Sequence, residues 1–438
     1  MTESALRTST FGFALPWGRE AVGGSNLGPV QPQERIGVLD VVRGFALFGI
    51  LQVNWGDFAG SLGNILQFSA EGKMRTIYSF LFGLGFAIQL IRAQEKGRPF
   101  LGRYLIRASL LFLIGAAHFV FIWRGDIIRE YAIMSLTLLV VARWHPRVIL
   151  VLAVVALGLE VVPKRMLPST TPGTGTFLMR ENPERVEQSA IALREDQELG
   201  FVATVKENHS AAGGSYWTGV RGGVALLARE LQSLDIYRFV RGDLISLFLL
   251  GLYVGRRRIF HEPEKHVRLF RWVLAIGLPL GLVANVYNGF GEWATRQGLP
   301  RLSSVLPQIG DNIVYSVGNY LLSLAYIAGV TLLFLHRARV RSWFAATLAP
   351  VGRMGLTNYL MQSVIMMTLL YRGFGLAEDV GGWWRMLLLE TVFVVQILYS
   401  RWWLKRFQFG PVEWAWRSLT WGRLQPMRIR EQRELVAG

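Results

Sequence analysis

A histidine and an aspartate separated by eight positions are the residues best suited to chemistry in this chain. The stretch GAAHFVFIWRGDIIREYAI covers residues 115–133 and contains His118, Asp126 and Glu130. Histidine takes and gives a proton near neutral pH, and a nearby carboxylate can hold its tautomer and stabilise its charged form. If the two side chains touch, they could act as a general base and its orienting partner.

Each of these residues also has a structural explanation, which is the better one when the residue is taken singly. Asp126 precedes an expected helix and could accept hydrogen bonds from the free N–H groups at its start. His118 could be a packing histidine with one hydrogen bond. The sequence leaves open whether the two side chains are in contact.

The first apolar segment, RIGVLDVVRGFALFGILQVNW at 35–55, also carries polar residues, which are costly in a membrane and often functional. A helical step of about 100° per residue gathers several residues on one side. They are Asp40, Arg43, Gly44, Leu47, Leu51 and Asn54. A self-neutralising Asp40–Arg43 pair, beside glycines that allow close helix packing, explains the pattern equally well.

Two later segments contain further polar side chains. In LAPVGRMGLTNYLMQSVIM, residues 348–366, Asn358 and Gln362 share a helical face and Arg353 points elsewhere. Amides at such positions often join neighbouring helices, which is the preferred explanation here. Glu390, within RMLLLETVFVVQ, is the deepest acid and requires a partner or a proton.

The elements that must position these residues are membrane helices. Of 438 residues, 52% are hydrophobic and only 18% are charged, against about 25% in ordinary soluble domains. Apolar runs of roughly 20 residues recur, which is long enough to cross about 30 Å of hydrocarbon. We therefore expect an all-α polytopic membrane protein with about ten transmembrane helices.

The sequence predicts five regions along the chain, with the fourth and ninth spans at 127–142 and 347–370. An amphipathic segment at 213–239 is expected along the membrane surface. The regions are a disordered cytoplasmic leader at 1–34, spans one to five in 35–162, an extracytoplasmic loop with the amphipathic segment at 163–240, spans six to ten in 241–405, and a basic cytoplasmic tail at 406–438.

The net charge of +17 comes largely from basic clusters in short segments between the apolar runs. This distribution is typical of the positive-inside rule and places both termini in the cytoplasm. It favours a lipid bilayer as partner and argues against nucleic acid. The chain has no cysteine, and the spacing of His261 and His266 fits one helical face poorly, so no metal site is predicted.

Three blocks of residues resemble one bacterial membrane family. RIGVLDVVRGFALFGILQVN resembles its R-x-x-x-L-D-x-x-R-G…N opening, and His118 followed by RGDIIREYAI resembles its H…GDIL-x-Y-A signature. LAPVGRMGLTNYLMQS and FGPVEWAWRSLTWGRLQPMR resemble its end block. Together, over residues 35–428, they make the chain similar to the YeiB-like family.

That family is similar in turn to the transmembrane acyltransferase superfamily, which includes the lysosomal heparan-α-glucosaminide N-acetyltransferase and bacterial O-acyltransferases. The resemblance implies a multi-pass protein of the bacterial plasma membrane. It would move an acyl group from cytoplasmic acyl-CoA to a hydroxyl or amine of an extracytoplasmic glycan, lipid or small molecule. The key histidine of the lysosomal enzyme follows its first helix, but residues 54–76 contain none here, so His118 receives this role by inference.

The resemblance gives the polar residues expected roles. The catalytic residues would be His118, Asp126 and Asn54, with Asn54 donating to the thioester oxyanion. Since arginine binds phosphate well, the acyl-CoA site would comprise Arg35, Asp40, Arg43 and Arg353. The substrate-binding residues would be Glu130, Asn358, Gln362 and Glu390. A narrow pore for the thioester arm would be lined by Gly44, Leu47 and Leu51.

Two other functions fit the same sequence, namely a transporter or exporter of a small polar or amphiphilic solute, and a non-catalytic membrane scaffold. An acyltransferase should bind CoA and lose activity when His118 is replaced. A transporter should depend on a solute and tolerate glutamine at that position better. The sequence leaves open the acyl chain, the acceptor and whether the protein is a homo-oligomer.

Overall fold

The computed structural model describes residues 36–56, 68–161, 216–232, 242–296, 308–372 and 382–429, and this part of the chain is almost entirely helical. Six of its helices are long and apolar enough to cross a membrane. They are Gly37–Trp55, Phe68–Glu95, Leu101–Phe121, Pro263–Tyr287, Val314–His336 and Gly382–Leu404. The protein is thus an all-helical, multi-pass membrane protein, whereas ten spans and cytoplasmic termini stay predictions.

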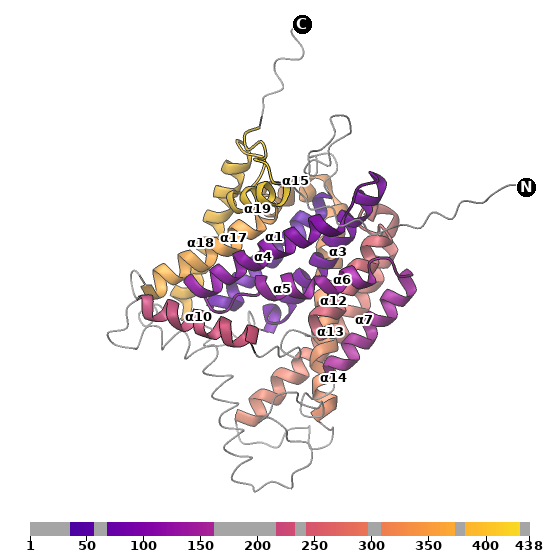
Figure 1. The fold of residues 1–438 in the computed structure, drawn as a ribbon. Coiled ribbons are helices and arrows are strands. Elements are labelled where there is room, and N and C mark those ends of the chain that lie inside the picture. Colours follow the sequence, from indigo (N-terminus) through magenta and orange to yellow (C-terminus); the bar gives the residue numbers. More distant parts are fainter. Residues whose placement is uncertain are drawn as a thin grey trace, which may run out of the picture.

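The helices form one bundle, with α19 at one end and α10 across the opposite end of α4 (Figure 1). Their bounds are α1 Gly37–Trp55, α3 Lys73–Glu95, α4 Leu101–Phe121, α5 Ile128–Met134, α6 Leu136–Val141, α7 Pro146–Val161, α10 Tyr216–Gln232, α12 Gly242–Arg256, α13 Val267–Arg296, α14 Gln308–His336, α15 Ala338–Ala346, α16 Leu348–Arg353, α17 Gly355–Met366, α18 Gly382–Leu404 and α19 Pro411–Trp421. A 3-10 turn, Pro263–His266, precedes α13, and a π-helical turn, Met367–Arg372, follows α17.

Two expected spans are not continuous helices. The segment 127–142 is divided at Ser135 into α5 and α6, where the Ser135 hydroxyl donates a hydrogen bond to the Ala132 carbonyl oxygen at 2.7 Å. The segment 347–370 is divided at Met354 into α16 and α17. A side-chain hydroxyl that bonds to the backbone competes with regular helix, and hydropathy alone does not reveal such a break.

Helix α1 lies in the centre of the core and approaches α16 very closely. Val41, Val42, Ala46, Leu47 and Leu51 of α1 are completely buried. The two helices meet at glycines, since a Cβ added to Gly44 would lie 2.1 Å from the Leu348 carbonyl oxygen. The small residues expected to permit close helix packing therefore do so here.

We predict that Gly352→Ala destabilises the protein by about 1–3 kcal/mol, because overpacking a close helix contact forces backbone shifts. An added Cβ at Gly352 would lie 1.9 Å from the Asp40 carbonyl oxygen. The measurement is the melting temperature in detergent. Gly158→Ala in α7 is the control, because nothing lies within 4 Å of its Cβ position. Equal melting temperatures for Gly352→Ala and wild type would mean that α1 and α16 lie further apart.

Candidate functional site

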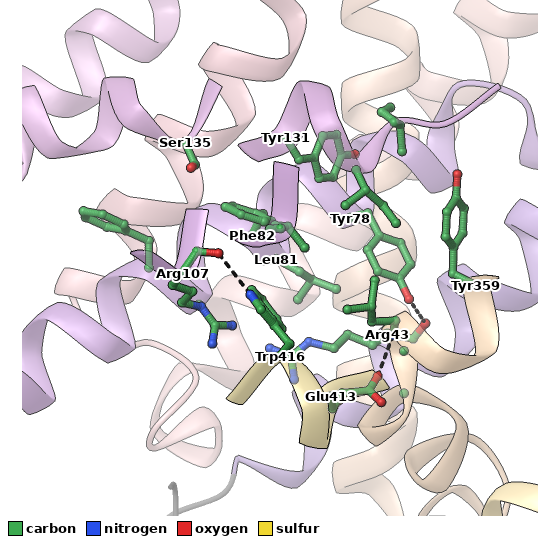
Figure 2. A pocket seen from close by; sticks show the side chains of 18 of the residues that line it. Arg43, Tyr78, Leu81, Phe82, Arg107, Tyr131, Ser135, Tyr359, Glu413 and Trp416 are labelled. Atoms are coloured by element: carbon green, nitrogen blue, oxygen red, sulfur yellow. Dashed lines mark hydrogen bonds between the residues drawn. The ribbon is translucent and has the colours of Figure 1, made fainter. Parts of the chain in front are cut away.

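A cavity of about 850 Å³ extends along α1 and is closed by α3, α4, α19 and the corner between α4 and α5 (Figure 2). Its α1 lining begins at Ile36 and ends at Asn54, which is about 27 Å at about 1.5 Å per residue. We call the part near Arg107 and Trp416 the α19 end, and the part near Asp126 the corner end. The cavity therefore has a length comparable to the hydrocarbon core of a membrane.

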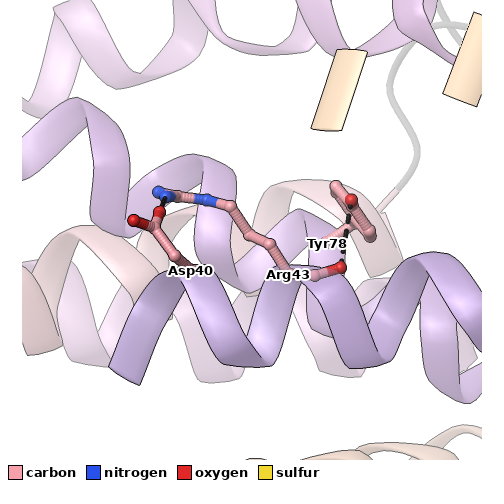
Figure 3. A network of polar contacts seen from close by, with 3 residues as sticks. All are labelled: Asp40, Arg43 and Tyr78. Atoms are coloured by element: carbon pink, nitrogen blue, oxygen red, sulfur yellow. Dashed lines mark hydrogen bonds and ion pairs between the residues drawn. The ribbon is translucent and has the colours of Figure 1, made fainter. Parts of the chain in front are cut away.

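The α19 end is rich in arginine. Six arginines line it, namely Arg43, Arg92, Arg103, Arg107, Arg353 and Arg417. One of them is neutralised as the sequence suggested, since Arg43 Nη1 lies 2.7 Å from Asp40 Oδ1 (Figure 3). The Tyr78 hydroxyl donates to the Arg43 carbonyl oxygen at 3.3 Å and so joins α3 to α1 here. Arginines outnumber the acids among the lining residues of this end, which makes it suitable for an anion.

Helix α19 closes this end with two tryptophan side chains, each of which stacks with an arginine of α4. Trp416 Nε1 donates to the Arg107 carbonyl oxygen at 3.0 Å, and the Arg107 guanidinium lies 3.6 Å from the centre of the Trp416 ring (Figure 2). Arg103 stacks on Trp421 at 4.0 Å in the same way. The sequence predicted a basic cytoplasmic tail here and missed this role. The available signal was the spacing of Arg103 and Arg107, four residues apart on one helical face.

The charge around Arg107 favours an anionic ligand. Arg417 and Arg43 are close enough to repel it electrostatically. Within the described residues, the Arg107 guanidinium has no carboxylate partner. Arginines gathered in a cavity bind phosphate or carboxylate groups well, because their planar donors match the oxygens of these anions.

At the corner end, His118 and Asp126 are in contact and buried. His118 Nδ1 lies 2.8 Å from Asp126 Oδ2, and the exposed fractions of the two side chains are 1% and 0%. Asp126 also has the structural role considered above, since its Oδ1 accepts the Arg129 N–H at 3.1 Å at the start of α5. One carboxylate thus caps a helix and orients an imidazole.

Gly115 allows this corner to fold back onto α4. A Cβ added there would lie 2.5 Å from the Arg129 backbone nitrogen and 2.8 Å from Asp126 Oδ1. The glycine of the GAAH stretch therefore positions the carboxylate. When Nδ1 donates to Asp126, Nε2 carries the lone pair that can take a proton. Within the described residues Nε2 is buried and has no hydrogen-bond partner.

His118 itself does not line the cavity. Trp123, Asp126 and Tyr359 do, and they surround it. The Tyr359 ring centre lies 5.6 Å from that of His118, and the Trp123 ring centre lies 6.2 Å away. The imidazole therefore lies directly behind the aromatic side chains that form the wall of the cavity.

The other expected site residues divide into two groups. The cavity is lined by Asn54, Asp40, Arg43, Glu130 and Arg353, whereas Arg35 lies outside the described residues. Asn358, Gln362 and Glu390 are away from the cavity lining. Asn358 Nδ2 donates to Ser400 Oγ at 3.0 Å, and Gln362 Nε2 donates to Gln396 Oε1 at 2.9 Å. These two amides join α17 to α18, as expected from the sequence for amides that link neighbouring helices.

The structure also supplies the missing partner of Glu390 and corrects the expected pore. Gln52 Nε2 donates to Glu390 Oε1 at 3.2 Å. The expectation that Gly44, Leu47 and Leu51 line the pore is wrong, because that side of α1 is buried against α16 and α17. The Leu47 carbonyl oxygen accepts Gln362 Nε2 there at 3.4 Å. The face of α1 that meets the cavity carries Leu39, Arg43, Ile50 and Asn54.

A buried carboxylate fixes α19 to the start of α17. Glu413 Oε1 accepts the N–H groups of Leu356 at 2.7 Å and Thr357 at 3.0 Å, and Oε2 accepts the Thr357 hydroxyl. These donors have no partner within α17, so the carboxylate acts as a cap supplied by another helix. Burial raises the pKa of the Glu413 carboxyl. Sequence reasoning missed this residue, whose signal was the single acid among residues 406–430 of the basic tail.

Comparison with known proteins shows the family of this chain. The chain is 32% identical over 429 residues to the uncharacterized protein YxaH of Bacillus subtilis, an alignment that covers 92% of this chain and 98% of the relative. The chain belongs to the YxaH-like family. It is also 28% identical over 422 residues to the uncharacterized protein YeiB of Escherichia coli, which covers 88% of this chain and 96% of that relative.

Within this family, residues 254–423 match the sequence family described as "Protein of unknown function (DUF418)". That match includes α17, α18 and α19, and therefore Tyr359, Glu413 and Trp416. The resemblance to YeiB expected from the sequence is confirmed. No solved structure matches the chain significantly.

Proposed function

We propose that this protein is a membrane acyltransferase that moves an acyl group from acyl-CoA to a hydroxyl or amine acceptor. One observation carries the proposal. A single cavity connects an arginine-rich end with a buried His118–Asp126 pair whose Nε2 is unpartnered. An anionic donor held at one end could extend its acyl group toward a base at the other. The base and the anion site are what this reaction requires.

The proposed step uses His118 as a general base. The acceptor hydroxyl gives its proton to Nε2 while its oxygen attacks the thioester carbonyl carbon. The carbon–sulfur bond breaks, and the CoA thiolate takes the proton from the imidazolium, which leaves one ester and one free thiol. Asp126 stabilises the imidazolium through Nδ1. Asn54, which lines the cavity, is the proposed donor to the oxyanion.

The proposed orientation follows the distribution of basic residues. The α19 end would face the cytoplasm, where acyl-CoA is found, and the corner end would face outward in a bacterial plasma membrane. The proposed acceptor is then an extracytoplasmic glycan, lipid or small molecule. The polar side chains of Glu130 and Arg124 at the corner end would contact it.

Acyl-CoA binding is the first test, measured as the thermal shift of detergent-purified protein with acetyl-CoA. A ligand that binds only the folded state stabilises it by mass action and so raises the melting temperature. At a hundredfold excess over Kd, the free energy of unfolding rises by about 2.7 kcal/mol. We expect a shift in wild type that is lost in Arg107→Gln. The control is Arg341→Gln, an exposed arginine outside the cavity lining, which should keep the shift. No shift with acetyl-CoA or longer acyl-CoAs in folded protein would contradict the proposal.

A transporter is the alternative, because a cavity along the whole of α1 also suits a permeation path. A transporter does not require a buried histidine–carboxylate pair. Solute uptake by proteoliposomes that His118→Gln leaves unchanged, without acyl-CoA binding, would favour the transporter.

A further inference from the structure

The proposed base is shut off from the cavity in this structure. The exposed fraction of the His118 side chain is 1%, and its Nε2 atom is fully buried. A proton acceptor must come within about 3 Å of the group that it deprotonates. Some neighbouring side chain must therefore move before a substrate in the cavity can reach Nε2.

Trp123 is poorly suited to that movement. Its ring packs on Trp55 at 5.1 Å between ring centres. On another side it fills the space beside Gly125, where an added Cβ would lie 2.2 Å from the Trp123 ring. The Trp123 backbone N–H also donates to the His118 carbonyl oxygen at 2.9 Å. Both its backbone and its ring are held, so the side chain is a fixed part of the wall.

Tyr359 has the properties of a movable wall. Its ring lies closer to His118, at 5.6 Å, and it lines the cavity (Figure 2). Its hydroxyl is buried and makes no hydrogen bond of good geometry among the described residues, and its one polar neighbour of this kind is the Ile127 backbone. Rotation of this side chain therefore breaks only its contact with the Ile127 backbone, and the ring borders an open cavity of about 850 Å³.

The backbone that carries Tyr359 is nevertheless firmly placed. Thr357 is bound through its N–H and its hydroxyl to Glu413. Asn358 is completely buried and hydrogen-bonded to Val351 and Ser400. Movement is thus confined to the Tyr359 side chain, and α17 stays in position.

We infer that the Tyr359 ring is a gate between the cavity and His118, so that Nε2 meets the contents of the cavity only when this ring turns aside. Tyr359 is then a positioning residue for the proposed base, and the biological role of this gate rests on the acyltransferase proposal. A closed gate keeps water from the base while an acyl thioester occupies the cavity, and so favours transfer over hydrolysis.

Carbethoxylation of histidine tests the gate without any acyl-CoA. Diethylpyrocarbonate adds an ethoxycarbonyl group to unprotonated imidazole, and peptide mass spectrometry separates His118 from the other five histidines. If the open form is at most about 10% populated, removal of the ring raises the rate about tenfold or more. We therefore expect fast modification of His118 in Tyr359→Leu and slow modification in wild type, with exposed His261 as the internal reference.

Two matched variants make the result specific. Tyr359→Phe keeps the ring and should leave His118 as slow as in wild type. Tyr78→Leu widens the same cavity at a tyrosine that forms no ring contact with His118 in the structure, and it should also leave the rate unchanged. Equal rates in wild type and Tyr359→Leu, or an equal increase in Tyr78→Leu, would overturn the gate. Tyr359→Met serves as a second opening variant if Tyr359→Leu melts below the assay temperature.

A second readout connects the gate to the reaction. With acetyl-CoA present, Tyr359→Leu should raise the ratio of thioester hydrolysis to acyl transfer, while Tyr359→Phe should not. If acyl-CoA does not bind but the carbethoxylation result holds, the gate stands and the acyltransferase proposal falls. If transfer is found but His118 reacts equally in all variants, the gate falls and the acyltransferase proposal stands.

Discussion

His118→Gln is expected to lower the rate of acyl transfer about 10²- to 10⁴-fold, the usual contribution of a general base, while acyl-CoA binding persists. Glutamine has a similar length and can still donate to Asp126, but its amide cannot take a proton near neutral pH. The measurement is release of free CoA thiol by the protein in liposomes, with a cell-envelope extract as the source of acceptor. Binding is followed in parallel by thermal shift with acetyl-CoA.

Asp126→Asn tests whether the pair acts as one unit. The new amide would place a donor opposite Nδ1 and so favour the wrong imidazole tautomer, which lowers the rate strongly in related base–orienter pairs. Residues that act together are not additive, so the double variant should be no slower than His118→Gln alone. Two outcomes would show that His118 is a packing residue. One is a double variant whose rate is reduced by the product of the two single-variant reductions, and the other is full activity of His118→Gln. His336→Gln, a histidine outside the cavity lining, is the control.

Glu413→Ala is expected to destabilise the protein by about 3 kcal/mol or more, because three donors would lose their acceptor and each buried unpaired donor costs about 1–3 kcal/mol. These donors are the two N–H groups at the start of α17 and the Thr357 hydroxyl. Loss of this cap should also release α19 from the cavity and weaken acetyl-CoA binding. The melting temperature in detergent, with and without acetyl-CoA, measures both effects.

The same carboxyl makes the stability of the protein depend on pH. Burial raises the pKa of Glu413, so the folded protein binds this proton more tightly than the unfolded chain does. The contribution of Glu413 to stability therefore falls as the pH rises from the ordinary pKa of a glutamate through the raised value. Glu413→Gln removes the titration and should flatten the melting temperature across that range.

Glu264→Ala, an exposed acid in the 3-10 turn before α13, is the control and should melt like wild type. A melting temperature of Glu413→Ala within a degree or two of wild type would mean that water replaces the carboxylate. In that case α19 would be only loosely attached to α17.

Much of the molecule could be predicted from the sequence because the relevant signals are local. Runs of apolar residues long enough to span a bilayer indicate a multi-pass helical protein without any knowledge of packing. Only seven residues lie between His118 and Asp126, and they include a tight corner, which made the contact of the two side chains a reasonable hypothesis. The Asp40–Arg43 pair lies within one helical turn and was equally accessible.

Only the tertiary structure decided which face of α1 meets the cavity and what closes its ends. The stripe from Gly44 to Leu51 suited a pore as well as a helix contact, and the close approach of α16 settled it as a contact. Trp416 and Arg107 are 309 positions apart, and Glu413 and Thr357 are 56 apart. Such contacts depend on how whole helices pack together, which periodicity within one helix does not encode.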